Sequence, residues 1–392
     1  MTSATLSLRS QFARANWALH RARVKKGLTS PMPKPPASRW LFISVDDPIS
    51  TAQIFPFFFY AGTLRRASSI ELREITLQDF LARAPYRGDV DVVWFQTWFD
   101  LTDVQMADLV EQLKAAYPGA LLIYLDWFAP TDLRYAEALN PHVAFYVKKH
   151  LLRDRTAYGR ATLGDSNLTD YYSRRLDPLL DPVVRNIPDS FWSKLIVGPN
   201  FAFTPQILQL SGMMPRHTKR PIDLHARIAV KGTPWYTAMR TEALEAAKQV
   251  RNLQVVCEGR ISRKEYIREL SGSKICFSPF GYGEVCWRDY EAVLKGALVV
   301  KPDMAHIETR PDIFRPFETY VPVRWDLSDL EEKVHHYVSH PQERDAIVKR
   351  AYGVIHNYVG GGEFLEQMSP VFRRVSPSRK LTALSARPLS LR

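Results

Sequence analysis

The sequence predicts an α/β protein of two doubly wound domains that face each other across a cleft. Short apolar runs alternate with helical patterns twice along the 392 residues, and an irregular stretch separates the two series. A chain of this length exceeds what one hydrophobic core normally organises, so two domains of roughly 150 to 200 residues are expected. With 46% hydrophobic and 24% charged residues, the composition is that of a globular protein.

The first series follows a proline-rich linker at residues 30–39. It predicts strands at residues 40–45, 91–96, 120–125 and 143–147, and helices at residues 54–64 and 104–116. The strand runs are apolar on both faces, which is typical of a parallel sheet covered by helices on each side. Residues 154–200 show little periodicity, and we expect irregular structure there.

The second series begins at residue 222. It predicts strands at residues 222–230, 253–257, 275–277, 297–300 and 319–323, and helices at 236–250, 263–270, from about Trp287, at 327–337 and at 342–358. The last helix is expected to stop at the glycines 360–362. The predicted parts are a basic segment at 1–39, a Rossmann-like N-terminal domain at 40–205, a Rossmann-like C-terminal domain at 206–365 and a basic tail at 366–392.

The formal net charge of +12 belongs to the two ends of the chain. Residues 1–39 contain eight Lys or Arg, residues 370–392 contain six, and neither segment contains an acidic residue. Residues 40–369 contain 39 basic and 41 acidic side chains. The nearly neutral folded region argues against a nucleic-acid partner. The acid-free ends suit contact with an anionic membrane surface, or they are simply solvated flanks.

Cysteine usage favours a reducing compartment. Cys257, Cys276 and Cys286 are odd in number and lack zinc spacing, so free thiols and a cytoplasmic location are expected. No apolar run approaches the roughly 20 residues needed to span a bilayer. The resulting expectation is a cytoplasmic protein with a peripheral contact to the inner face of the membrane.

The N-terminal segment predicts a short surface helix with no cleanly polar face. One helical face holds Leu8, Phe12, Ala15 and Leu19. Another holds Leu6, Ala13, Trp17 and Val24.

Residues 273–303 suggest a ligand site as well as a fold. A buried strand leads into a Pro/Gly loop, then into a helix carrying Arg288 and Glu291, and then into a second strand. In a βαβ unit of this kind the loop and the helix N-terminus lie at the carboxyl edge of the sheet, where ligands bind. Gly281 and Gly283 allow the backbone to approach a ligand, and the helix start offers amides to a phosphate. The plainer interpretation is a tight turn before a helix with acidic residues near its N-terminus.

The order G-Y-G, W-R-x-Y-E-A and K-G-A-L-V-V in this segment resembles the donor-binding segment of GT-B glycosyltransferases, in particular the group 1, exostosin-like and CgeB-like bacterial enzymes. In the group 1 pattern seven residues separate two glutamates. A small residue follows the second glutamate directly, and a glycine lies five positions after that glutamate. Glu291, Ala292 and Gly296 match the second half of the pattern. The first glutamate falls on Gly283, and Glu284 lies one position later.

The resemblance implies a nucleotide-sugar donor as co-substrate with no separate cofactor, and a glycan or lipid-linked acceptor in bacterial surface polysaccharide or glycoconjugate synthesis. Basic residues after the first strand of the C-terminal domain hold the donor diphosphate in such enzymes, and Arg227 and Lys231 occupy the comparable place, with Arg240 as a substitute. Glu291 would accept hydrogen bonds from sugar hydroxyls. The full set of expected donor-binding residues is Arg227, Lys231, Arg240, Tyr282, Gly283, Arg288 and Glu291.

The N-terminal domain is expected to present the acceptor and, with Glu284, to complete the catalytic site. Asp126 follows a predicted strand and precedes Trp127, and aromatic surroundings raise the pKa of a carboxylate toward that of a general base. Asp46 and Asp47, at the end of the first strand, are rivals. An aspartate after a strand is also a common turn or cap residue.

A metal site is not expected. Asp89 and Asp91 form a D-x-D sequence, but it precedes a strand and therefore lies on the wrong edge of the sheet. His225, His306 and His335 have no partners at metal-ligand spacing.

The resulting prediction is a metal-independent glycosyltransferase. Two alternatives share the fold: a nucleotide-sugar epimerase, which needs no acceptor, and a non-catalytic nucleotide-sugar-binding protein, which the departure at Gly283 keeps open.

Overall fold

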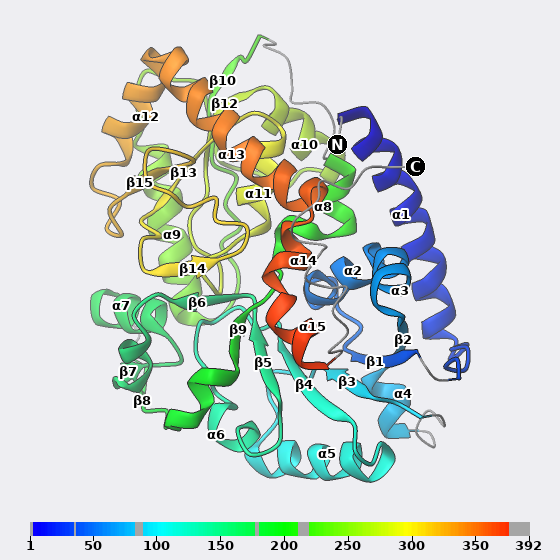
Figure 1. Ribbon diagram of the computed structural model, residues 1–392. Coiled ribbons are helices and arrows are strands. Elements are labelled where there is room, and N and C mark those ends of the chain that lie inside the picture. The colour runs from blue at the N-terminus through cyan, green and yellow to red at the C-terminus, as the bar shows by residue number, and fades with distance from the viewer. Residues whose placement is uncertain (1–2, 35–36, 83–88, 177–179, 211–218, 376–392) are drawn as a thin grey trace.

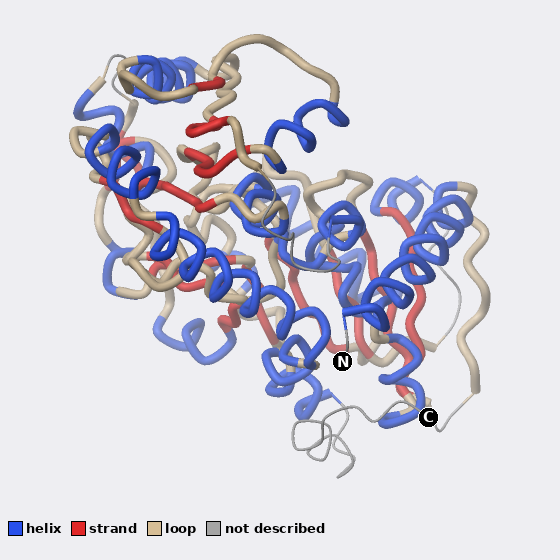
Figure 2. The backbone as a smooth tube through the Cα atoms, turned by 90° about the horizontal axis from the view of Figure 1, so that it is seen from above, coloured by secondary structure: helices blue, strands red, loops and turns tan. Residues whose placement is uncertain are grey.

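A computed structural model describes residues 3–34, 37–82, 89–176, 180–210 and 219–375. The chain forms two parallel sheets, each covered by helices, with the first domain in the lower half of Figure 1 and the second in the upper half. Seen from above, helices enclose the strands (Figure 2). The predicted architecture of two doubly wound α/β domains is confirmed.

The N-terminal sheet has six parallel strands in the order β2-β1-β3-β4-β5-β9. They are β1 (Ser38–Ser44), β2 (Ile70–Thr76), β3 (Val92–Phe95), β4 (Leu121–Asp126), β5 (Phe145–Lys148) and β9 (Leu195–Val197). Four of them were predicted, whereas β2 and β9 were missed. Strand β2 was not predicted because its sequence contains charged residues, among them Glu74. This glutamate is nevertheless fully buried, and it accepts a hydrogen bond from the Ser44 hydroxyl at 2.6 Å.

Helices and short strands fill the connections of the N-terminal domain. They are α1 (Ser3–Lys25), α2 (Thr51–Phe59), α3 (Ala61–Ser68), α4 (Leu77–Ala82), α5 (Asp103–Ala116), α6 (Ala136–Leu139), α7 (Asn167–Arg175), α8 (Pro205–Leu210), β7 (Thr162–Leu163) and β8 (Pro182–Val183). The single helix predicted at residues 54–64 is two helices that meet at Tyr60. Helix α5 starts where predicted, at a capping box in which Thr102 and Gln105 bond each other's backbone amides.

The C-terminal sheet has five parallel strands in the order β11-β10-β12-β13-β15. They are β10 (Ile222–His225), β11 (Val255–Val256), β12 (Ser273–Phe277), β13 (Leu298–Pro302) and β15 (Val321–Val323), with helices α9 (Pro234–Lys248), α10 (Arg263–Ser271), α11 (Trp287–Leu294), α12 (Leu330–Ser339) and α13 (Pro341–Gly361). Each was predicted. Strand β10 ends at His225 rather than at residue 230, which leaves residues 226–233 as a loop over the carboxyl edge.

The chain returns to the N-terminal domain at its end. From α13 it enters α14 (Glu363–Gln367) and α15 (Ser369–Val375), drawn in red beside β3 and β4 (Figure 1). Phe372 packs 5.7 Å from Trp40, and Phe364 packs 5.1 Å from Phe57, measured between ring centroids. Residues 366–375, predicted to belong to a basic tail, therefore form part of the N-terminal core. The rest of that tail lies outside the described residues.

A backbone ladder joins the two domains. Strand β6 (His150–Leu152), which follows β5, pairs antiparallel with β14 (Ile307–Thr309), which follows β13. Arg153 and Asp312 add an ion pair of 3.1 Å across the same boundary. The N-terminal domain is thus fixed to the C-terminal domain just beyond the carboxyl ends of their central strands.

Both sheets change direction at an equivalent place. In the N-terminal sheet β2 lies on one side of β1, and β3 and the later strands lie on its other side. In the C-terminal sheet β11 and β12 flank β10 in the same way. Loops separate at such a switch point, and ligands of doubly wound proteins bind there.

No helix in the described ranges is long and apolar enough to span a membrane.

Candidate functional site

A cavity of about 510 Å³ lies at the switch point of the C-terminal sheet. The C-terminal domain supplies most of its lining, from the loop after β12, the first turn of α11, and the neighbouring helices α9 and α10. Pro48, after β1, and Gln206, on α8, line the opposite side. The cavity therefore lies between the two domains, where the topology predicts a ligand.

Helix α11 directs its N-terminus at this cavity, because Cys286, Trp287 and Arg288 all line it. Asp289 is fully buried behind them and accepts hydrogen bonds from the Cys286 amide at 2.7 Å and the Ser278 hydroxyl at 2.6 Å. These bonds fix the loop between β12 and α11. The positive end of the helix dipole is consequently held against the cavity, as an anionic ligand requires.

Arg288 and Glu291, the two residues expected to contact the donor most directly, line the same cavity. The Arg288 guanidinium donates to the backbone carbonyls of Arg227 and Phe277, which follow β10 and end β12. Glu291 is 4% exposed, and its Oε1 lies 2.5 Å from Nη2 of Arg263, another cavity residue. The structure thus brings together two guanidinium groups and one carboxylate.

The other predicted basic residues divide between the wall and the rim. Arg240 is buried in the wall, where its Nη1 donates to the Phe280 carbonyl at 2.9 Å, and burial lowers the pKa of its guanidinium. Arg227 turns instead to Glu269, with Nε and Oε2 2.6 Å apart. Lys231 is exposed on the loop of residues 226–233, and no partner is recorded for it among the described residues.

Tyr282 and Gly283 do not line the cavity. Tyr282 stacks on Tyr236 with ring centroids 4.2 Å apart, and its hydroxyl accepts a hydrogen bond from the Thr233 amide at 3.0 Å. A Cβ atom at Gly283 would lie 1.9 Å from the carbonyl oxygen of Ala129 in the N-terminal domain. The glycine therefore admits the backbone of the other domain, which corrects the expectation that it admits a ligand.

Glu284 lies in the interface between the domains and is completely buried. Its carboxylate oxygens are 3.6 Å from Nε2 of His150 and 3.5 Å from Nε2 of His306. Burial opposes ionisation of Glu284, yet the two nearby imidazoles hold the pKa of its carboxyl well below its usual range. The expected catalytic glutamate thus faces a histidine cluster and not the cavity.

Asp126 is also fully buried and has three hydrogen-bond donors. Its carboxylate accepts from Nζ of Lys148 at 2.9 Å, from the Tyr146 hydroxyl at 2.6 Å and from the Phe128 amide at 3.0 Å. The aromatic surroundings expected from the sequence exist, but they include a lysine ammonium. The Asp126 carboxylate and the Lys148 ammonium thus form an ion pair in which both side chains are fully buried.

Neither rival aspartate lines the cavity, but Asp47 stands next in sequence to a residue that does. It precedes Pro48 of the cavity wall and is half-buried, with Oδ1 accepting the Ile49 amide at 2.6 Å. Asp46 forms an ion pair with Arg21, with Oδ1 and Nη2 2.7 Å apart.

Lys149 is a residue near the site that the sequence analysis overlooked. It is 1% exposed, and its Nζ lies 4.7 Å from the ring centroid of Phe201, which stacks on the cavity residue Trp287 at 4.6 Å. Burial lowers the pKa of Lys149 to about 7. The K-K-H sequence directly after a predicted strand is the signal that marks this position.

Within the residues that the structure describes, no group of three His, Cys, Asp or Glu side chains is placed to hold a metal ion. Asp89 and Asp91 of the D-x-D sequence both bond Arg39, at 2.9 and 2.7 Å. The three cysteines are free thiols.

Residues 216–359 match a family model described as glycosyl transferase-like. This segment is less than half of the chain and contains the whole C-terminal sheet and α11. No curated protein sequence matches the chain significantly.

Three solved structures are similar to the chain at low sequence identity. HepE of Anabaena in complex with UDP-glucose is 11% identical, with a TM-score of 0.44 over 86% of this chain and 99% of that chain. A glycosyltransferase of Rickettsia africae is 10% identical, with a TM-score of 0.49 over 87% and 99%. An alpha-glucosyltransferase in complex with UDP-glucose and DNA containing an abasic site is 9% identical, with a TM-score of 0.49 over 85% and 98%.

No residue role is transferred from these structures, because their identities are far too low. What the comparisons show is that residues 216–359, which hold the C-terminal sheet and most of the cavity lining, are similar to a glycosyl transferase-like family.

Proposed function

We propose that the chain transfers a hexosyl or related sugar from a nucleotide-sugar donor in the interdomain cavity to a hydroxyl group that the N-terminal domain presents. The observation that supports this most directly is the convergence of Arg240, Arg263 and Arg288 with the N-terminus of α11 on one cavity. These groups suit a diphosphate, which carries its negative charge in a compact form. We expect a glycan or lipid-linked acceptor, in bacterial surface polysaccharide or glycoconjugate synthesis.

In this mechanism the leaving diphosphate is stabilised without a metal. Negative charge develops on the nucleotide diphosphate as the bond to the anomeric carbon breaks. Arg288 and the α11 dipole are already held in place by backbone hydrogen bonds, so they stabilise that charge with little reorganisation. Glu291 would accept hydrogen bonds from the hydroxyls of the sugar, which fixes the donor for attack.

For the general base we favour Asp47 over Asp126. An inverting transfer needs a carboxylate that can reach the acceptor hydroxyl, and Asp47 is only half-buried and directly precedes Pro48 of the cavity wall. Asp126 is enclosed by Lys148, Tyr146 and the Phe128 amide.

Alanine substitutions separate these two roles. Asp47→Ala is expected to lower the rate of transfer about 100-fold or more with little change in the free energy of unfolding. Asp126→Ala leaves the buried Lys148 ammonium without its carboxylate and is expected to lower that free energy by about 3 to 5 kcal/mol. Initial rates and urea unfolding measure the two effects. An Asp126→Ala protein of normal stability that has lost transfer would reverse the assignment.

Donor binding is the direct test of the proposed function. In a thermal-shift panel of nucleotide sugars, the true donor is expected to add about 2.7 kcal/mol of stability at a concentration 100 times its dissociation constant. The free sugar serves as the control and should not stabilise the protein. If no nucleotide sugar raises the melting temperature, the proposal is wrong. Turnover of the donor to its epimer without any acceptor would favour the epimerase.

We also propose that the protein is cytoplasmic and associates with an anionic membrane face.

Binding of donor without any turnover would favour the non-catalytic alternative.

A further inference from the structure

Helix α1 has two apolar faces, and the structure packs only one of them. Trp17 and Val24 are 8% and 2% exposed and lie against the N-terminal domain. On the other face Phe12 and Leu19 are 63% and 66% exposed. The exposed face consists of Phe12, Ala15, Leu19 and Ala22. A helix of a globular domain normally turns polar residues outward, so this face calls for a covering partner.

The surroundings of this face are basic. The first acidic residue of the chain is Asp46, and it is already paired with Arg21 and Lys25 at 2.7 and 2.9 Å. Arg23 and Lys26 are exposed at the end of α1. The Arg23 guanidinium donates to the Ser30 hydroxyl at 3.5 Å, and among the described residues no carboxylate pairs with the Arg23 or Lys26 side chain.

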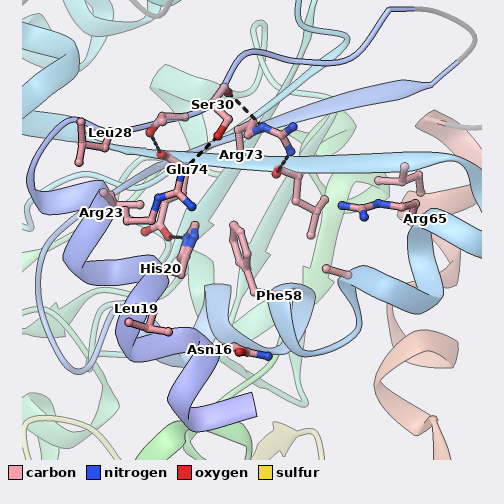
Figure 3. A pocket seen from close by; sticks show the side chains of 15 residues that line it. Asn16, Leu19, His20, Arg23, Leu28, Ser30, Phe58, Arg65, Arg73 and Glu74 are labelled. Carbon is pink, nitrogen blue, oxygen red and sulfur yellow. Dashed lines mark hydrogen bonds and ion pairs between the residues drawn. The ribbon is translucent and has the colours of Figure 1, made fainter. Parts of the chain in front are cut away.

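A pocket of about 410 Å³ opens beside α1, between that helix, α2, α3 and β2 (Figure 3). Arg23 and Arg65 lie on opposite sides of it with Phe58 between them, and Arg73 comes from β2. Arg65 and Arg73 share one carboxylate, that of Glu71, at 2.5 and 3.4 Å. Glu74 also lines the pocket, but it is paired with Arg21 and with His20. Counting Arg21, four guanidinium groups face two carboxylates, which leaves the pocket with a positive balance.

The apolar part of the surface continues from this pocket. A second hollow of about 290 Å³ shares Asn16, His20 and Phe58 with it and is otherwise lined by aromatic and small residues, among them Phe12 and Phe59. An elongated groove, positive at one end and aromatic at the other, therefore runs along α1. Its chemistry is complementary to an anionic amphiphile.

We propose that the exposed face of α1 and the groove beside it bind the surface of an anionic lipid bilayer. Phe12 and Leu19 lie among the acyl chains, and a lipid phosphate lies among Arg23, Arg65 and Arg73. Transfer of exposed Phe and Leu side chains from water into an apolar medium is favourable. A lipid surface offers such a medium, whereas nucleic acid would leave these side chains in water.

The position of α1 links this surface to the interdomain cavity. Helix α1 packs against α8, and Gln206 of α8 lines that cavity. A membrane-bound orientation would bring the cavity close to acceptors held in the lipid. The bilayer contact itself does not depend on the proposed sugar transfer.

Vesicle sedimentation of the full chain tests the proposal. We expect binding to vesicles of phosphatidylcholine mixed with phosphatidylglycerol and none to phosphatidylcholine alone, with binding that weakens as salt is added. The double variant Phe12→Ser/Leu19→Ser is expected to bind about tenfold or more weakly. Val104→Ser, which changes another exposed apolar side chain (71% exposed, on α5), is the matched control and should bind normally. At equal ionic strength, inorganic phosphate should displace the protein no more than sodium chloride does.

Two outcomes would overturn the proposal. One is a double variant that binds anionic vesicles as the unmodified protein does. The other is loss of binding only when residues 376–392 are deleted, which would assign the contact to the basic tail. The substituted side chains are exposed, so the variant should keep both its melting temperature and its stabilisation by a nucleotide sugar. Failure of vesicle binding is thereby distinguished from failure of the proposed function.

Discussion

Arg288→Ala is expected to lower the rate of sugar transfer by about 100- to 1000-fold. The reason is that its guanidinium is fixed at the N-terminus of α11 by two backbone carbonyls and lines the cavity where the diphosphate would develop charge. Removing one such prearranged donor from an active site has effects of about this size. Transfer rates with a saturating donor provide the measurement, and Arg315→Ala, an exposed arginine of the same domain, is the control.

A companion substitution distinguishes donor binding from structural support. Glu291→Ala should also impair transfer, because it removes the proposed acceptor of sugar hydroxyl bonds. Glu291 is paired with Arg263, so Arg263→Ala breaks the ion pair and removes one group of the proposed diphosphate site, while the carboxylate remains. A smaller loss in Arg263→Ala than in Glu291→Ala supports contact with the sugar. If Arg288→Ala and Glu291→Ala both leave donor hydrolysis and transfer unchanged, the donor site is wrongly placed.

The position of Arg288 and Glu291 at the cavity could be predicted because it depends on a local stretch of sequence. Arg288 and Glu291 stand on a helix between two consecutive strands, and the βαβ order alone brings that helix N-terminus to the carboxyl edge. The strands β3 and β4 were equally accessible, since both are apolar on each face. Strand β2 was hidden by the buried Glu74.

Features that depend on the neighbouring strand or domain could not be predicted. Asp126 stands opposite Lys148 in the register of β4 and β5, and periodicity along one strand does not reveal that pairing. Lys149 is connected to the cavity through its contact with Phe201, which lies in a later segment of the chain. Glu284 likewise meets His150 from the other domain.

Gly283→Ala is expected to destabilise the protein by about 1 to 3 kcal/mol or more. The added Cβ would lie 1.9 Å from the Ala129 carbonyl oxygen, and a backbone atom cannot yield as a flexible side chain does. Gly281→Ala is the matched control, since its nearest new neighbour is the Cys286 sulfur at 3.4 Å. Urea unfolding compares the two proteins. Equal stabilities would show that the two domains do not approach so closely at this point.

The same contact gives a physical reason for the departure from the group 1 pattern. A glutamate at position 283 would carry the same Cβ and larger atoms beyond it, so the close approach of Ala129 excludes it. Glu284 cannot substitute, because its carboxylate is enclosed with His150 and His306. The N-terminal domain therefore lies against the half of the pattern that is missing, while the half that is present, with Glu291, faces the cavity. Gly283→Glu is accordingly expected to lose stability at least as strongly as Gly283→Ala and to gain no transfer activity, as unfolding and rate measurements would show.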